Sequence, residues 1–191
     1  MAIFSFVIVH DTGFAPNPFG GFLTLATCKP QIRKSAQLGD WIVGTGSART
    51  VGAGKLVYAA RISKVVPIEV YGRSADYLVK RPSVRGTWWK KHGDNIYTIQ
   101  DGRWVQRRNR HHFERDIQRD VKGVKVLVCE EFWYFGGSAI SIPPRLAEII
   151  KQGRGHKRIT DEALINKFAA WLRATPVGVH GRPEMEDASC S

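Results

Sequence analysis

Four separate segments rich in β-branched and aromatic residues place the strongest limit on the fold of this chain. They lie at residues 3–9, 41–45, 55–66 and 124–134, and each has the composition of a buried β-strand. The connections between them differ in length and form no regular alternation of strand and helix. A glycine-rich phosphate loop between a strand and a helix is also missing, so a small, partly closed mixed barrel with flanking helices is expected rather than a doubly wound parallel sheet.

Local signals predict the turns and helices between these strands. Residues 10–21 contain several glycines and prolines and are expected to form an ordered loop. A proline at its first position favours a short helix over residues 30–36. Thr160 is a suitable cap for a later helix whose apolar residues recur at helical spacing. Asp101-Gly102 predicts a hairpin with a tight two-residue turn.

The composition is that of one soluble domain. A chain of 191 residues with 43% hydrophobic residues buries one substantial core, and we predict an α+β domain over residues 1–175 followed by a disordered tail over 176–191. Three cysteines without a close pair argue against a disulfide framework. The first residues lack the features of a secretory signal, and no apolar run approaches the roughly 18 residues of a membrane span. We therefore expect a cytoplasmic protein without a membrane partner.

The charge of the chain is strongly positive and indicates a polyanionic partner. Lys and Arg number 29 against 17 Asp and Glu, which gives a formal charge of +12. Nucleic acid, either DNA or RNA, or a modified nucleotide is the simplest partner for such a surface. The alternative is that the charge serves only solubility. The oligomeric state does not follow from the sequence.

Several short motifs occur in one order along residues 3–158. The motifs are Phe14-Ala15-Pro16-Asn17-Pro18-Phe19, Thr24-Leu25-Ala26-Thr27-Cys28-Lys29-Pro30, Gly39-Asp40-Trp41, Gly44-Thr45-Gly46-Ser47, Gly93-Asp94-Asn95-Ile96-Tyr97 and Gly153-Arg154-Gly155-His156. Together they resemble the nucleotide modification associated domain 2 family, which is grouped with the PUA-like superfamily of ASCH, EVE and YTH domains and linked to DNA modification in bacteria and phage. The resemblance implies a small, mixed PUA-like β-barrel with flanking helices.

Related PUA-like readers take a base into a pocket lined by aromatic rings and polar groups, and the resemblance implies the same here. A flipped base needs ring faces for stacking and fixed polar groups for its edge. The aromatic candidates are Trp41, Trp88, Trp89, Tyr97, Trp104, Trp133 and Tyr134. The polar candidates are Asn17, Thr45, Ser47, Asp94 and Asn95. Trp41 and Trp133 lie within predicted strands, where a place in the core is the alternative.

Basic residues are candidates for phosphate contacts. Lys29 and Arg33 are four residues apart in a predicted helix and would project from one face. Arg154 and His156 lie in a glycine-containing basic segment, for which a simple surface loop is an equally good interpretation. A further cluster consists of Arg107, Arg108 and Arg110.

The sequence leaves the choice between a binding module and an enzyme open. His111-His112 matches no zinc signature, and we expect neither a metal nor a cofactor. The leading hypothesis is a module that recognises a modified base through an aromatic pocket with a basic rim. The alternative is a hydrolase, an amidohydrolase or a nuclease, that acts on a modified nucleotide. Small amidohydrolases among PUA-like proteins use a lysine nucleophile, which would here be Lys29 with Thr24 and either Asp94 or Glu130.

Overall fold

The computed structural model describes residues 1–185 and has a mixed α/β fold whose strands lie in three sheets. The largest sheet contains, in spatial order, β11 (His156–Ile159), β1 (Ile3–Ile8), β3 (Trp41–Gly46), β4 (Lys55–Arg61), β9 (Glu131–Tyr134) and β12 (Gly178–Val179), and β10 (Ile140–Ser141) also pairs with β4. β1 runs parallel to β3, and β12 runs parallel to β9, while the other pairs are antiparallel. The sheet is therefore mixed, and the expectation against a doubly wound parallel sheet is confirmed.

A second sheet continues from the first. It consists of β2 (Leu23–Leu25), β8 (Lys125–Cys129) and β5 (Lys64–Pro67), and the hairpin of β6 (Tyr97–Gln100) and β7 (Arg103–Gln106) forms a third. The long strands predicted over 55–66 and 124–134 are each divided at the bend between the first two sheets. Ser63 Oγ fixes this bend, since it donates to the carbonyl of Val128 at 3.1 Å and accepts from the N–H of Glu130 at 3.0 Å.

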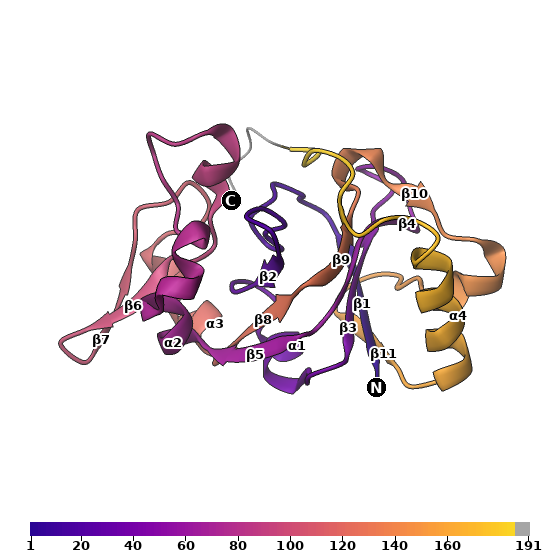
Figure 1. Cartoon of the computed structure of the whole chain (residues 1–191), viewed down its shortest axis with the longest axis horizontal. Coiled ribbons are helices and arrows are strands. Elements are labelled where there is room, and N and C mark those ends of the chain that lie inside the picture. The colour runs from indigo at the N-terminus through magenta and orange to yellow at the C-terminus, as the bar shows by residue number, and fades with distance from the viewer. Residues whose placement is uncertain (186–191) are drawn as a thin grey trace.

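Residues 1–185 do not form the closed barrel that both the order of strands and helices and the family resemblance predicted. The predicted strands near residues 3, 41 and 55 lie side by side in the first sheet, but the one that begins near residue 124 starts in the second sheet as β8 and joins the first sheet only after the bend, as β9. The three sheets remain separate, and Figure 1 shows the second sheet and the hairpin extending to one side of the first. A relation to the PUA-like superfamily stays a prediction.

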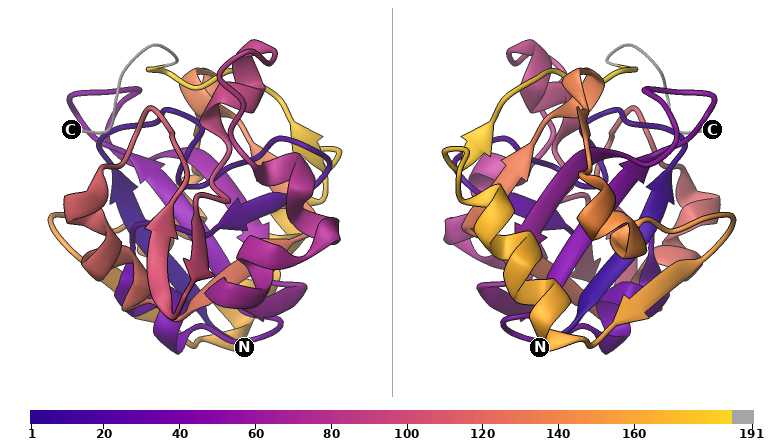
Figure 2. Two further views of the ribbon diagram at one scale, coloured as in Figure 1. Left: turned by 90° about the vertical axis from the view of Figure 1, so that its left-hand side faces the viewer. Right: turned by 90° about the vertical axis from the view of Figure 1, so that its right-hand side faces the viewer.

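Helices cover both ends of this arrangement (Figures 1 and 2). The α-helices are α1 (Pro30–Ser35), α2 (Ile68–Arg73), α3 (Ile117–Val121) and α4 (Glu162–Leu172), and 3₁₀ helices occupy Ala75–Lys80, Trp88–His92, Glu114–Asp116, Gly136–Ser138 and Pro144–Ile149. The cap of α4 is Asp161 rather than Thr160, because the Asp161 carboxylate accepts from the N–H of Leu164 at 3.1 Å. α4 packs Ile165 and Phe168 against one face of the first sheet.

Both faces of the first sheet are buried. Trp41 and Trp133 stack at 6.0 Å on the face that α4 covers, while Phe4 and Phe6 lie in a separate core on the opposite face. The second sheet closes that core with Leu127 and its neighbours. Strands buried on two sides read as continuous apolar runs, which explains why the sequence predicts them clearly.

The hairpin and the C-terminal segment complete the fold. Asp101 and Gly102 both have positive φ, and Ile99 pairs with Trp104, so the predicted two-residue turn is confirmed. Part of the predicted disordered tail, residues 178–179, forms β12 against β9, and residues 186–191 lie outside the described residues. Within the described residues, every helix is too short or too polar to span a bilayer.

Candidate functional site

Three segments that are far apart in the sequence meet at one site. Cys28 lies on the turn between β2 and α1, His112 lies on the loop after β7, and Asp120 lies in α3. Cys28 and the next residue, Lys29, have φ angles of 56° and 38°. Left-handed backbone is strained for residues other than glycine and concentrates at functional sites. This turn resembles the sharp strand-to-helix turns that present catalytic nucleophiles.

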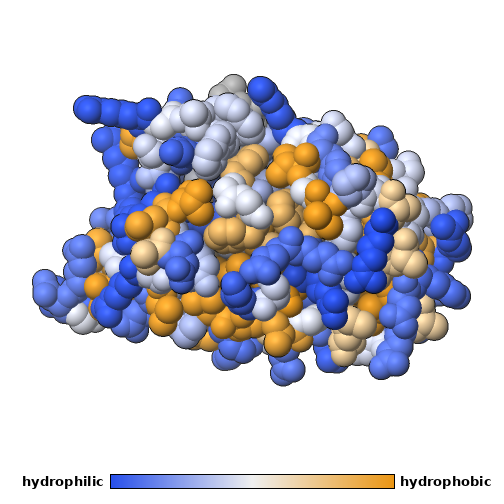
Figure 3. Space-filling model, in the orientation of Figure 1, coloured by the Kyte–Doolittle hydropathy of each residue, from blue (hydrophilic) through white to orange (hydrophobic). Residues whose placement is uncertain are grey.

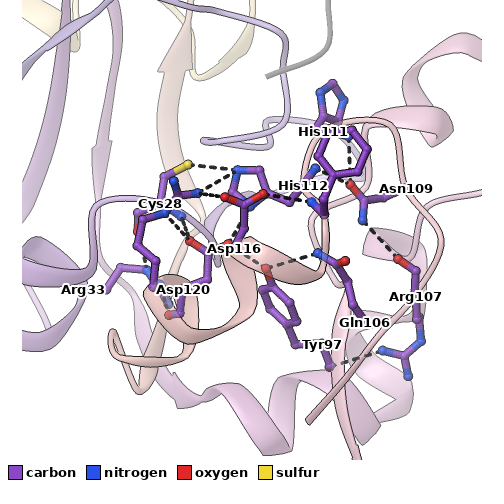
Figure 4. Close-up of polar contacts among 12 residues, drawn as sticks. Cys28, Arg33, Tyr97, Gln106, Arg107, Asn109, His111, His112, Asp116 and Asp120 are labelled. Carbon is purple, nitrogen blue, oxygen red and sulfur yellow. Dashed lines mark hydrogen bonds and ion pairs between the residues drawn. The ribbon is translucent and has the colours of Figure 1, made fainter. Parts of the chain in front are cut away.

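Cys28, His112 and Asp120 form a chain of polar contacts (Figure 4). Sγ of Cys28 lies 3.4 Å from Nε2 of His112. Nδ1 of His112 lies 2.5 Å from Oδ2 of Asp120. The cysteine and the carboxylate therefore face opposite nitrogens of one imidazole ring. A nucleophile, a base and an orienting carboxylate need this order.

The carboxylate of Asp120 is fully buried and holds the parts of the site together. Oδ2 also accepts a hydrogen bond from the hydroxyl of Tyr97 at 2.8 Å. Oδ1 accepts from the backbone N–H of Cys28 at 3.0 Å. One carboxylate thus orients the ring of His112 and fixes the backbone of Cys28.

The electrostatics of the site favour a charged imidazole. Burial alone would favour neutral His112, but its contacts with Asp120 and Cys28 prevail and raise its pKa to about 9. Burial likewise opposes ionisation of Asp120, yet the hydrogen bond from His112 holds the pKa of this carboxyl below its usual range. At neutral pH the pair is an imidazolium and a carboxylate, so an N–H of the imidazolium points toward the sulfur of Cys28.

Arg33 is buried directly beneath the site and braces it. Its side chain is fully buried, and its guanidinium donates to three backbone carbonyls. Nε donates to the carbonyl of Cys28 at 2.8 Å, Nη1 to that of Lys125 at 2.9 Å, and Nη2 to that of Asp120. The structure therefore directs the predicted phosphate-contact residue inward. Gly123 lies against the guanidinium, where a Cβ would collide with it.

Cys28 and His112 open into a pocket of about 460 Å³, a size suited to a small ligand. The end of β1 and Ala15 form its apolar wall. Its polar lining consists of His10, Lys29, Arg115, Asp116 and Arg119. The pocket thus gives partly exposed Cys28 access to solvent beside several cationic side chains.

The same three side chains could be considered as metal ligands, because their ligand atoms lie within 4.8 Å of one another. Their orientation does not suit one ion, since Asp120 already contacts Nδ1 of His112 while Cys28 faces Nε2. Arg119 places a guanidinium nitrogen 3.4 Å from Nε2, and a cation there disfavours a second cation. The arrangement fits a nucleophilic site better than a metal centre.

Two other predicted residues, Asn17 and Asp94, lie in a second buried network. Asp94 accepts hydrogen bonds from the hydroxyls of Thr24 at 2.7 Å and Tyr71 at 2.6 Å. Nζ of Lys80 donates to Oδ1 of Asn17 at 2.9 Å, and burial lowers the pKa of Lys80 to about 7 although Asp94 opposes the shift. The structure brings Thr24 and Asp94 together, as the lysine-nucleophile hypothesis requires.

The other members of that hypothesis lie elsewhere. Lys29 lines the pocket beside Cys28, and Glu130 forms a surface ion pair with Lys64 at 3.0 Å. Lys29, the predicted nucleophile, therefore lies beside the Cys28–His112–Asp120 chain rather than beside Thr24 and Asp94.

Several other predicted binding residues are buried inside the fold. The buried members are Thr45, Asn95, Tyr97 and Trp133. Tyr97 belongs to the site through Asp120, whereas Trp133 packs in the core and donates its indole N–H to the carbonyl of Thr175 at 2.8 Å. Ser47 is partly exposed and bonds within its own turn to Thr50.

Trp88 and Trp89 lie at a separate pocket of about 510 Å³. Phe19 meets Trp88 edge to face at 5.1 Å, and the guanidinium of Arg182 lies over Trp88 at 5.1 Å from the ring centroid. Four glycines also line this pocket: Gly20, Gly21, Gly178 and Gly181. The pocket combines aromatic surface with a cation.

The remaining basic candidates are distributed over the surface. Arg108 and Arg110 line a third pocket together with Lys91, while Arg107 donates to backbone carbonyls of Tyr97 and Gly72. His156 is part of β11, and Arg154 lies in the loop before it. On the face shown in Figure 3, hydrophilic residues surround smaller apolar patches. The structure does not gather these cations at the pocket of Cys28.

Sequence reasoning missed the roles of Cys28 and Asp120. It noted His111-His112 and searched for metal-ligand spacing, but the cysteine lies 84 residues from His112. A local signal was present in the order of strand, cysteine and proline-initiated helix around Cys28.

The fold and the site define a mixed α/β protein with a Cys–His–Asp chain at a surface pocket. The sequence matches the model of the family described as nucleotide modification associated domain 2 over residues 1–190. The chain belongs to this family, which confirms that part of the resemblance drawn from the motifs. Comparison with curated proteins and with solved structures gave no match.

Proposed function

We propose that this protein is a cysteine-dependent hydrolase that acts on a modified nucleotide or on a modified base in nucleic acid. The observation that carries the proposal is the Cys28–His112–Asp120 chain at the pocket. Membership of a nucleotide modification associated family supports a nucleotide substrate, and the charge of +12 suits phosphate. The proposal develops the hydrolase alternative with Cys28, rather than Lys29, as the nucleophile.

The geometry suits hydrolysis of an amide or ester on the base. The thiolate sulfur of Cys28, whose proton is held by His112, would form a bond to the carbonyl carbon while the carbonyl electrons move to oxygen. When the carbonyl re-forms, the bond to the amine or alcohol breaks, and His112 gives that leaving group its proton. Water, deprotonated by His112, then cleaves the thioester and releases the acid. Asp120 holds the imidazole in position through both steps.

Product analysis with defined variants tests this proposal. Nucleosides, nucleotides and oligonucleotides that carry acylated bases would be incubated with the protein and analysed by mass spectrometry. We expect Cys28→Ala to reduce turnover by about 10³-fold or more, while Cys190→Ala, which removes another thiol, leaves turnover unchanged. Full activity in the Cys28→Ala protein would contradict the assignment of the nucleophile.

A second candidate function is recognition of a base by the aromatic pocket, which would preserve the reader hypothesis and its relation to PUA-like proteins. The edge-to-face contact of Phe19 with Trp88, and the guanidinium of Arg182 over the same indole, favour it. A nucleobase inserted beside these rings would gain stacking and cation–π contacts.

Binding measurements test the aromatic pocket. Trp88→Ala is expected to weaken binding of oligonucleotides with modified bases about tenfold, because one stacked base contributes roughly 1–3 kcal/mol. Trp171→Ala, in α4 and outside the aromatic pocket, serves as the matched control. Affinity would be measured at two salt concentrations, since phosphate contacts weaken with salt. Equal affinities of the two variants and the parent protein would refute a stacking role for Trp88.

A further inference from the structure

We propose that the pocket beside Cys28 selects substrates that carry an anionic group, a phosphate or a carboxylate, next to the bond that is attacked. The inference deepens the proposed function and rests on it for the role of Cys28. Its basis is the three cations that line the pocket together with Cys28: Lys29, Arg115 and Arg119, the last of which also pairs with Asp116 at 3.1 Å and Asp120 at 3.5 Å.

Lys29 is the cation whose surroundings most clearly indicate an anion. It follows Cys28 directly, and its ammonium lies 4.6 Å from the ring centroid of Phe6. Within residues 1–185, Lys29 has no ion pair with a carboxylate. Burial lowers the pKa of this lysine. An ammonium that is partly withdrawn from water without an anion is a group that an anionic ligand stabilises.

The rest of the lining adds to the positive charge. Among the described residues that line the pocket, Asp116 is the one acid, and it already accepts hydrogen bonds from the N–H of Phe113 at 2.9 Å and pairs with Arg119 at 3.1 Å. The guanidinium of Arg115 lies over the ring of Phe113. Apolar residues of β1, including the Phe6 that Lys29 contacts, also line the pocket, and a low-dielectric wall strengthens the attraction of these cations for an anion.

Two alkylating reagents of nearly equal size measure this preference. Iodoacetate is an anion and iodoacetamide is neutral, and each transfers its CH₂ carbon to the sulfur with loss of iodide. The rate constants at Cys28 would be followed by peptide mass mapping on the full chain at pH 7. We expect the ratio of the iodoacetate rate to the iodoacetamide rate to exceed that of glutathione about tenfold.

Single-charge variants locate the source of the preference. Lys29→Gln should lower the ratio several-fold, and Lys29→Arg should retain it. Lys34→Gln removes the same charge from an exposed position in α1 and should leave the ratio unchanged. A parent ratio equal to that of glutathione, or a ratio that Lys29→Gln leaves unchanged, would overturn the inference.

A second measurement does not depend on the thiol. Inorganic phosphate, a nucleoside 5′-monophosphate and acetate should each raise the melting temperature of the parent protein more than that of Lys29→Gln, and the order of the three distinguishes a phosphate from a carboxylate. Equal shifts in both proteins would contradict the anion site. Alkylation could instead be slow with both reagents while the shift in melting temperature still depends on Lys29. That result would contradict the proposed thiol chemistry and support the anion site.

Discussion

Replacing His112 with asparagine is expected to slow alkylation of Cys28 by iodoacetamide about 100-fold at pH 7. The imidazolium of His112, whose Nε2 lies 3.4 Å from Sγ, stabilises the thiolate, which is the form of cysteine that attacks an alkylating reagent. One to two units in the pKa of a thiol change its thiolate fraction about 10- to 100-fold. Asparagine keeps a polar side chain that can donate to Asp120, so the loop stays packed. The measurement is the rate of mass increase of the Cys28 peptide.

A matched control separates this effect from a general change in the pocket. His10 lines the same pocket without taking part in the chain from Cys28 to Asp120, so His10→Asn should react at the parent rate. Equal rates in the parent and in His112→Asn would remove the case for a nucleophile and base pair.

The same histidine should also make stability depend on pH. Its pKa rises from about 6.5 in the unfolded chain to about 9 in the fold. The stabilisation by charged His112 is therefore fully present below pH 6.5 and is lost as pH rises through 9. We expect the free energy of unfolding in urea to fall over this range by about 2 kcal/mol, and to fall less in His112→Asn.

Local signals predicted much of the fold because short-range physics determines those elements. The hairpin at Asp101 and Gly102 requires positive φ at two consecutive residues, and both have it. The apolar runs of β1 and β3 form strands because both faces of their sheet are buried. The bend at Ser63 could not be predicted in this way, because it depends on contacts with Val128 and Glu130 on another strand.

The arrangement of the candidate site could not be predicted from local sequence patterns either. The spacing of Lys29 and Arg33 predicted two cations on one helical face, but Lys29 lies outside α1 in left-handed backbone. Helical periodicity therefore does not relate the two side chains. Arg33 points inward because Gly123 leaves room for its guanidinium. The meeting of Cys28 with His112 depends on the packing of distant loops, which no local pattern contains.

Arg33→Met is expected to destabilise the fold by about 3–5 kcal/mol, the largest loss of stability that we predict. The substitution keeps an apolar stem of similar length but removes the guanidinium that donates to the carbonyls of Cys28 and Lys125, and it takes away one of the donors to the carbonyl of Asp120. Urea unfolding measures the loss, and Lys34→Met at the neighbouring exposed position is the control.

The outcome also decides between the two interpretations of Arg33. A residue that met phosphate from solvent would weaken nucleic acid binding on replacement and leave the free energy of unfolding within about 0.5 kcal/mol. A residue that braces the site should instead lower the stability and, in the fraction that remains folded, slow the alkylation of Cys28, whose carbonyl it holds. Arg33→Lys tests the geometry, because one ammonium cannot match the three directions of a guanidinium. It should therefore recover part of the stability while the alkylation rate stays below that of the parent.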